Sequence, residues 1–113
     1  MHELSLASEV IELAHKEAIK NKVTVIREIL VEIGTLSGVE ADAFELAMEL
    51  AVKNSILENS VLRIIRTPGK GKCNTCDHEF EVVQLPVICP ECNGYAVEIN
   101  SGNAFRVVSL TVD

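Results

Sequence analysis

Two cysteine pairs, Cys73-Asn74-Thr75-Cys76 and Cys89-Pro90-Glu91-Cys92, determine how this chain folds. Each pair can sit on a tight turn whose backbone amides point at the sulfur atoms. Four thiolates from two such turns give a closed tetrahedral zinc site. Because no ligand is missing, we expect the zinc to be structural. A segment of about thirty residues cannot build a self-sufficient core, so metal binding would provide its fold.

Other chemistries compete with zinc for these cysteines. Disulfides are disfavoured because the pairs occur in a chain without an export signal, and a reducing cytosol keeps thiols free. An iron site and a dithiol redox pair at Cys73 and Cys76 are the alternatives, and a redox pair would cycle in a protein that stays folded. His78 is interpreted as a solvated or outer imidazole, or as one that exchanges into a metal site. Gly94 can adopt the left-handed conformation that such turns need.

Break signals flank the cysteine segment, at Pro68-Gly69-Lys70-Gly71-Lys72 and Asn100-Ser101-Gly102-Asn103. Before the second helix, Ser37-Gly38-Val39-Glu40 matches a capping box. Outside the cysteine segment the apolar periodicity predicts helices at residues 4–20 and 39–53, and strands at residues 23–33, 61–67 and 105–112.

The order of these elements indicates that the cysteine segment is an insertion. The last strand would then return to pair in the first sheet. We therefore predict an α+β fold, a small sheet with two helices plus an inserted zinc-ribbon-like module built on the four cysteines. The predicted domains are a discontinuous α/β domain, residues 1–68 plus 101–113, and a zinc-binding domain, residues 69–100.

The composition narrows the class of protein. The chain has 113 residues, of which 48% are hydrophobic, and few are aromatic, so an aliphatic core is expected. No apolar run is long enough for a membrane span, and the acidic start does not resemble a secretory signal, so we expect a cytoplasmic protein. The net charge of -7 repels phosphate backbones, which argues against nucleic acid as a partner.

The first three residues, Met1-His2-Glu3, can chelate a metal ion. The Met1 amine, the His2 amide and the His2 Nδ1 atom close two fused rings, and after amide deprotonation these donors fall in one plane. Planar nitrogen ligation suits Ni(II) or Cu(II) better than zinc. The Glu3 amide or carboxylate can complete the site. The competing interpretation is a frayed terminus without function.

These features occur together in the order Met1-His2-Glu3-Leu4-Ser5, Ile33-Gly34, Leu36-Ser37-Gly38-Val39-Glu40, Pro68-Gly69 and the two cysteine pairs. In this combination the chain resembles the HypA/HybF family of hydrogenase maturation nickel-insertion proteins over essentially its whole length. The resemblance implies that His2 is the essential nickel ligand, helped by the Met1 amine and the amides of His2 and Glu3. It places Glu40 near nickel, where a helix-capping role is the alternative. It assigns structural zinc to Cys73, Cys76, Cys89 and Cys92.

The function implied by the resemblance is that of a nickel metallochaperone, not an enzyme. Its cargo would be Ni(II), and its partners a nickel-binding maturation GTPase of the HypB type, the large subunit of NiFe-hydrogenase and, in some relatives, urease maturation factors. Neither nucleic acid nor a membrane is expected, and the protein would be a monomer or a homodimer. The competing function is a zinc-ribbon adaptor or regulatory protein with no nickel role.

Overall fold

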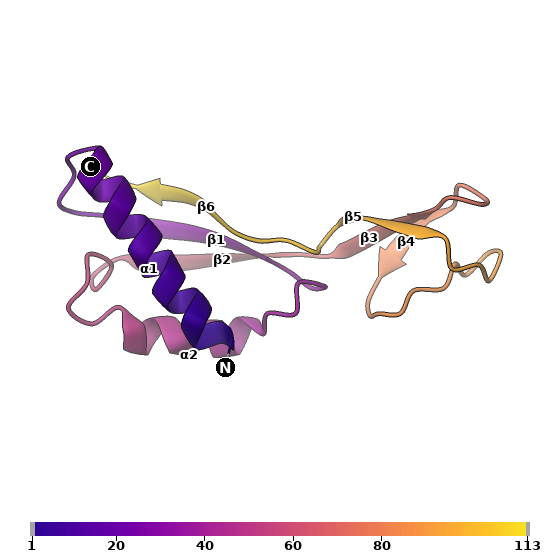
Figure 1. The fold of residues 1–113 in the computed structure, drawn as a ribbon, viewed down its shortest axis with the longest axis horizontal. Helices are drawn as coiled ribbons and strands as arrows, with labels where there is room; N and C mark the ends of the chain where they lie inside the picture. The colour runs from indigo at the N-terminus through magenta and orange to yellow at the C-terminus, as the bar shows by residue number, and fades with distance from the viewer. Residues whose placement is uncertain (1, 113) are drawn as a thin grey trace.

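The chain forms two three-stranded sheets that follow one another along its long axis (Figure 1). They are seen in a computed structural model that describes residues 2–112 and measures 54 × 27 × 17 Å. The two helices beside these small sheets confirm the predicted α+β class. In chain order the elements are α1 (His2–Lys20), β1 (Glu28–Gly34), α2 (Ala41–Ala51), β2 (Val61–Thr67), β3 (Gly69–Cys73), β4 (Glu79–Val82), β5 (Val97–Ser101) and β6 (Phe105–Thr111).

The first sheet has the strand order β2-β1-β6. β1 lies in the middle, parallel to β2 and antiparallel to β6, and an irregularity between Leu30 and Val31 shifts its register with β6. The last strand therefore does return to the first sheet, as the sequence predicted. No helix of residues 2–112 has the length and apolarity to cross a membrane.

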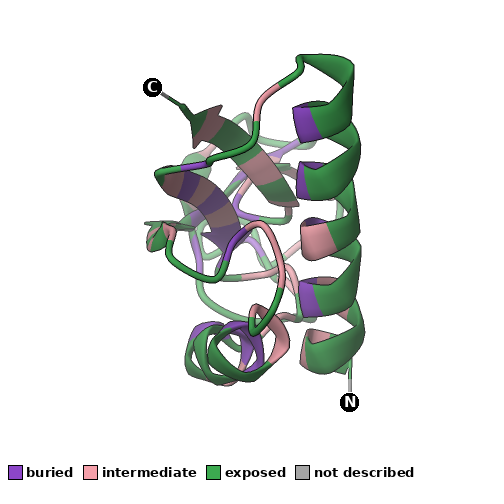
Figure 2. Cartoon of the chain, turned by 90° about the vertical axis from the view of Figure 1, so that its left-hand side faces the viewer, coloured by how far each residue is buried: buried purple, intermediate pink, exposed green. Residues whose placement is uncertain are grey.

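The core lies between this sheet and the two helices. Inward-facing Ile29, Val31 and Ile33 of β1 are 3% exposed or less. Buried residues of α1 line the side of the helix that faces the sheet (Figure 2). Phe44 of α2 meets Phe105 edge to face, with ring centroids 5.2 Å apart. Each such fully buried side chain contributes about 1.5–3 kcal/mol.

The first strand is shorter than predicted. Lys22, at φ 56°, takes the left-handed conformation just after α1, and β1 begins only at Glu28. Between them Ile26 is buried, whereas Val25 is 55% exposed. The alternation of Val23 and Val25 therefore does not continue the buried face of β1, and the prediction of a strand from residue 23 was wrong.

The capping box was also wrong. The N-cap of α2 is Glu40, whose carboxylate accepts from the Asp42 backbone N–H at 3.4 Å. Ser37 instead accepts from the Val39 N–H, so it closes a local turn before the helix. Gly38, at φ +81°, takes the left-handed conformation in that turn, which separates Ser37 from the helix.

The glycine-rich segment that signalled a linker is mostly a strand. β3 is the middle strand of the second sheet, between β4 and β5, and pairs antiparallel with both. Its Gly69 and Gly71 are buried. A Cβ on Gly71 would lie 2.9 Å from a methyl group of Val97, so this glycine permits close packing of β5 rather than flexibility.

Candidate metal centres

The four cysteines converge in the second sheet and its loops. Their sulfur atoms all lie within 4.8 Å of one another, and the pairs Cys73–Cys92 and Cys76–Cys89 are each 3.6 Å apart. A tetrahedral zinc ion with Zn–S bonds of ~2.3 Å separates its sulfurs by about 3.8 Å. The sulfur positions therefore suit a tetrahedral zinc ion, and the four thiols would be its ligands.

The two cysteine pairs repeat one backbone pattern. The Cys73 N–H donates to the His78 carbonyl, and the Cys89 N–H donates to the Gly94 carbonyl, both at 2.9 Å. The Thr75 N–H points at the Cys73 sulfur, at 3.4 Å. Amides aimed at sulfur favour the thiolate form, which is the form that binds metal.

The left-handed residues of these turns are Asp77 and Asn93, at φ 63° and 61°. Each follows the second cysteine of its pair, and each donates its N–H to the carbonyl of the first cysteine, at 2.9 Å. The expectation that Gly94 would be left-handed was wrong, because its φ is not positive. Asp or Asn directly after each pair was the sequence signal, since both residues tolerate this conformation.

The thiols do not ionise alike. Backbone N–H groups of Cys76 and Thr75 lower the pKa of Cys73 to about 6. The His78 N–H lowers the pKa of Cys76, but desolvation and the neighbouring thiols, Cys89 first, outweigh it and raise that pKa to about 12. Four negative charges cannot share this volume without a cation. Zinc binding would therefore displace protons from the site.

The predicted nickel site lies at the start of α1. The Met1 amine is outside the described residues. The His2 side chain is 57% exposed, and its Nδ1 atom is 3.5 Å from the Glu3 carboxylate. The same carboxylate oxygen of Glu3 accepts from the Glu40 backbone N–H at 3.1 Å, which holds the pKa of Glu3 below its ordinary value. The first turn of α1 therefore contacts the N-cap of α2; the resemblance implied that Glu40 lies near the nickel site, but not this hydrogen bond from its backbone.

The backbone N–H of Glu40 contacts the Glu3 carboxylate of this site, while the carboxylate of Glu40 caps α2. The imidazole of His78 is not part of the sulfur cluster, although its backbone contacts it; the ring stacks on Phe80, with centroids 5.6 Å apart. Within residues 2–112, the four cysteines are the group of three or more His, Cys, Asp or Glu side chains that lie close enough together to hold a metal ion. A nickel site at His2 thus depends on main-chain nitrogen donors.

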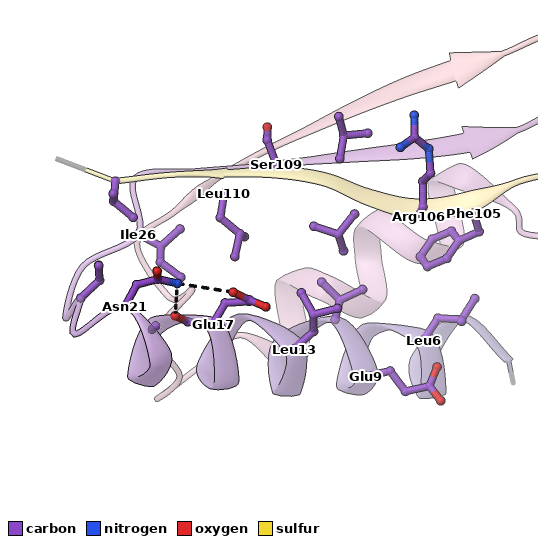
Figure 3. Close-up of a pocket in the computed structure, with 16 residues that line it drawn as sticks. Leu6, Glu9, Leu13, Glu17, Asn21, Ile26, Phe105, Arg106, Ser109 and Leu110 are labelled. Atoms are coloured by element: carbon purple, nitrogen blue, oxygen red, sulfur yellow. Dashed lines mark hydrogen bonds between the residues drawn. The ribbon is translucent and has the colours of Figure 1, made fainter.

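A separate apolar groove, with a volume of about 980 Å³, runs between α1 and β6 (Figure 3). Leu6 and Leu13 of the helix face Phe105 and Leu110 of the strand across it. Its lining includes neither His2 nor a cysteine. The groove is therefore distinct from both candidate metal centres.

Residues 1–112 match the family model described as "Hydrogenase/urease nickel incorporation, metallochaperone, hypA". The chain belongs to the HypA family. Hydrogenase maturation factor HypA of Parabacteroides distasonis is 40% identical over 114 residues, covering 99% of this chain and 97% of the relative. The HypA of Francisella philomiragia is 39% identical over 110 residues, covering 97% of each chain.

Solved HypA structures share the fold. The solution structure of the Ni metallochaperone HypA from Helicobacter pylori superposes with a TM-score of 0.67 at 30% identity, covering 96% of this chain and 94% of that one. A second HypA solution structure has a TM-score of 0.71 at 31% identity, covering 97% and 94%. The predicted family is confirmed. It is a family of nickel-binding metallochaperones for hydrogenase and urease, and the clustered cysteines of this member provide a site suited to structural zinc.

Proposed function

We propose that this chain binds Ni(II) at its N-terminus and delivers it to the large subunit of NiFe-hydrogenase. The ligands would be the Met1 amine, the His2 amide and imidazole and, fourth, the Glu3 amide. Because the family description names urease as well as hydrogenase, we extend the proposal to urease maturation. Donation would involve a nickel-binding maturation GTPase of the HypB type, in the cytoplasm, without catalysis by this chain.

The observation that carries the proposal is the position of His2 in the first turn of α1. The first four N–H groups of an α-helix have no intrahelical acceptor. The amides of His2 and Glu3 therefore lose no helical hydrogen bond when a metal displaces their protons. The exposed imidazole of His2 lies on the same residue, so one short segment offers both kinds of nitrogen donor.

The surface position also suits release. Nickel at the His2 Nδ1 atom would replace its contact with the Glu3 carboxylate, a contact between partly solvated groups. An acceptor protein can then substitute its ligands for these one at a time. Because the amide donors must be deprotonated, acid competes with nickel, so lowering the pH would favour release. Glu40 is proposed as a neighbour of the nickel rather than as a ligand.

The cysteines have a different role in this proposal. Cys73 and Cys89 are fully buried, and the four sulfurs leave no open coordination position for cargo. Zinc there would hold the loops of residues 69–100 together, as the zinc-binding domain. Nickel would be carried by the second domain, residues 1–68 plus 101–113.

Calorimetry on the untagged, zinc-loaded protein tests this function. We expect His2→Ala to abolish high-affinity nickel binding while zinc content stays the same. His15→Ala is the matched control, because His15 is an exposed histidine of the same helix. An extension before Met1 should weaken binding as well, since it removes the free amine. Equal nickel binding by wild type and His2→Ala would leave the zinc-ribbon adaptor as the better interpretation.

A further inference from the structure

Three segments of the chain meet where the two sheets join: residues 34–36 at the end of β1, residues 67–69 from the end of β2 to the start of β3, and residues 101–104 from the end of β5 to just before β6. We call this place the junction. Thr35 bridges both sheets, because its N–H donates to the Thr67 carbonyl at 2.9 Å and its Oγ1 accepts from the Gly69 N–H at 3.1 Å. The Leu36 N–H donates to the Gly102 carbonyl at 2.7 Å. The end of β1 is therefore bonded to both connections.

Glycines make this approach possible. A Cβ on Gly34 would lie 2.1 Å from the Gly102 carbonyl oxygen, and a Cβ on Gly102 would lie 2.4 Å from the Gly69 Cα. Leu36 covers Gly69 from the other side, because its Cδ1 atom lies 2.5 Å from where a Gly69 Cβ would stand. All three glycines are buried. The backbones at the junction are thus in direct contact, with no room for the segments to slide.

The same segment continues to the N-terminal residues. The Ser37 N–H donates to the Gly34 carbonyl at 3.0 Å, and the Val39 N–H donates to the Ser37 hydroxyl at 3.2 Å. Glu40 then donates its N–H to the Glu3 carboxylate. An unbroken series of contacts therefore runs from the first residue of β3 to the first turn of α1.

We propose that residues 34–40 are a positioning segment that holds the cysteine module, residues 69–100, in a fixed orientation relative to the N-terminal residues. Two covalent connections alone would form a hinge about which the second sheet could bend. The third segment removes that freedom, because bending would separate Gly69 from Thr35 and Leu36 from Gly102. An acceptor protein that contacts both ends would then meet a preorganised surface and lose less entropy on binding. This last consequence rests on the proposed function, whereas the fixed orientation does not.

Nuclear magnetic resonance on the full-length, zinc-loaded protein tests the orientation directly. In wild type, residual dipolar couplings from both sheets should fit a single alignment tensor, and nitrogen relaxation should give both sheets the same rotational correlation time. Two independent tensors in wild type would overturn the proposal. Neither measurement requires nickel, so the outcome is separable from a failure of the nickel hypothesis.

Thr35→Val is the informative variant, because it keeps the branched shape and removes the Oγ1 acceptor of the Gly69 N–H. We expect the two sheets to need separate tensors, and Gly69 amide exchange to accelerate about threefold to tenfold. Thr35→Ser should restore wild-type behaviour. Thr24→Val is the matched control, since Thr24 is exposed and outside the junction. Zinc content establishes that each variant is folded, and a Thr35→Val protein indistinguishable from wild type would contradict the role of this residue.

Discussion

Under the proposed function, the cysteine module and the N-terminal site would hold metal in opposite ways. The module gathers four side-chain sulfurs within 4.8 Å and buries two of them, so its backbone is already arranged for an ion that stays. The N-terminal site offers one exposed imidazole, and the rest of its donors belong to the main chain. A structural metal site must find all its ligands within the chain. A site that transfers its metal must instead leave its ligands accessible to an acceptor protein. If the proposal holds, the difference teaches that one small chain can keep a structural metal and a cargo metal at separate sites.

Removing the structural metal should have the largest effect. Cys89→Ala deletes a fully buried ligand and leaves three thiols that cannot close the site. Because zinc provides roughly 10–16 kcal/mol in small zinc-folded peptides, we expect residues 69–100 to lose their fold. Amide spectra should show the module collapsing while β1 and the helices keep their resonances. A chelator added to wild type should do the same, and a module that stays ordered without zinc would refute the metal-dependent fold.

A core substitution should produce the converse pattern. Phe44 is fully buried, and Phe44→Ala should cost about 3–5 kcal/mol of unfolding free energy. Denaturant titration should show the first sheet and helices weakened while zinc is retained. Leu46→Ala in the same helix is the control, because Leu46 is 57% exposed and its truncation should change stability by about 0.5 kcal/mol or less. Equal losses for the two variants would contradict the described core.

Glu40 contacts Glu3 beside the N-terminal site, so its substitution sharpens the comparison. If its carboxylate serves α2 as the N-cap, Glu40→Ala should lower stability by about 0.5–2 kcal/mol. Nickel affinity should stay within about twofold, since the backbone N–H that contacts Glu3 is unchanged. Thermal unfolding and calorimetry measure the two quantities. A fall of about tenfold or more in nickel affinity would instead make Glu40 a ligand.

The sheet itself provides the smallest expected effect. Glu32 of β1 accepts from the Thr67 hydroxyl at 2.7 Å and from Arg106, and these bonds hold its pKa below the ordinary value of 4.5. Its stabilising contribution is therefore complete above pH 4.5 and is lost as the pH falls through the lowered pKa. Thr67→Val should raise the pKa of Glu32, as a carboxyl titration by nuclear magnetic resonance would show. An unchanged pKa would mean that the hydroxyl does not set it.

Much of the fold could be predicted because its signals are local. Helical periodicity located α1 and α2, and the paired cysteine spacing located the module. The middle strand β3 was missed because its glycines resemble a linker, and only tertiary contacts explain their presence: Val97 lies against Gly71, and Leu36 lies against Gly69. The resemblance implied that Glu40 lies near the first residues, but the hydrogen bond from its backbone to Glu3 was missed because it joins residues far apart in the chain.

The candidate sites also include some residues that their sequence pattern predicts and others that only the fold reveals. Side-chain ligands that recur at fixed spacing, such as Cys73 and Cys76, can be predicted from their pattern. The junction cannot, because the need for Gly34, Gly69 and Gly102 arises only where three segments cross. Nothing in the sequence signals that Thr35 will bridge two sheets.

X-ray absorption spectroscopy of the untagged, zinc-loaded protein carrying one equivalent of nickel tests most directly whether cargo and structural metal occupy separate sites. The nickel edge should show nitrogen and oxygen ligands in planar geometry, with no sulfur scattering, while the zinc edge keeps four sulfurs. The nitrogen-ligated nickel signal should disappear in His2→Ala. Sulfur bound to nickel in the wild-type protein would contradict the account, because the cysteine module would then be carrying the cargo.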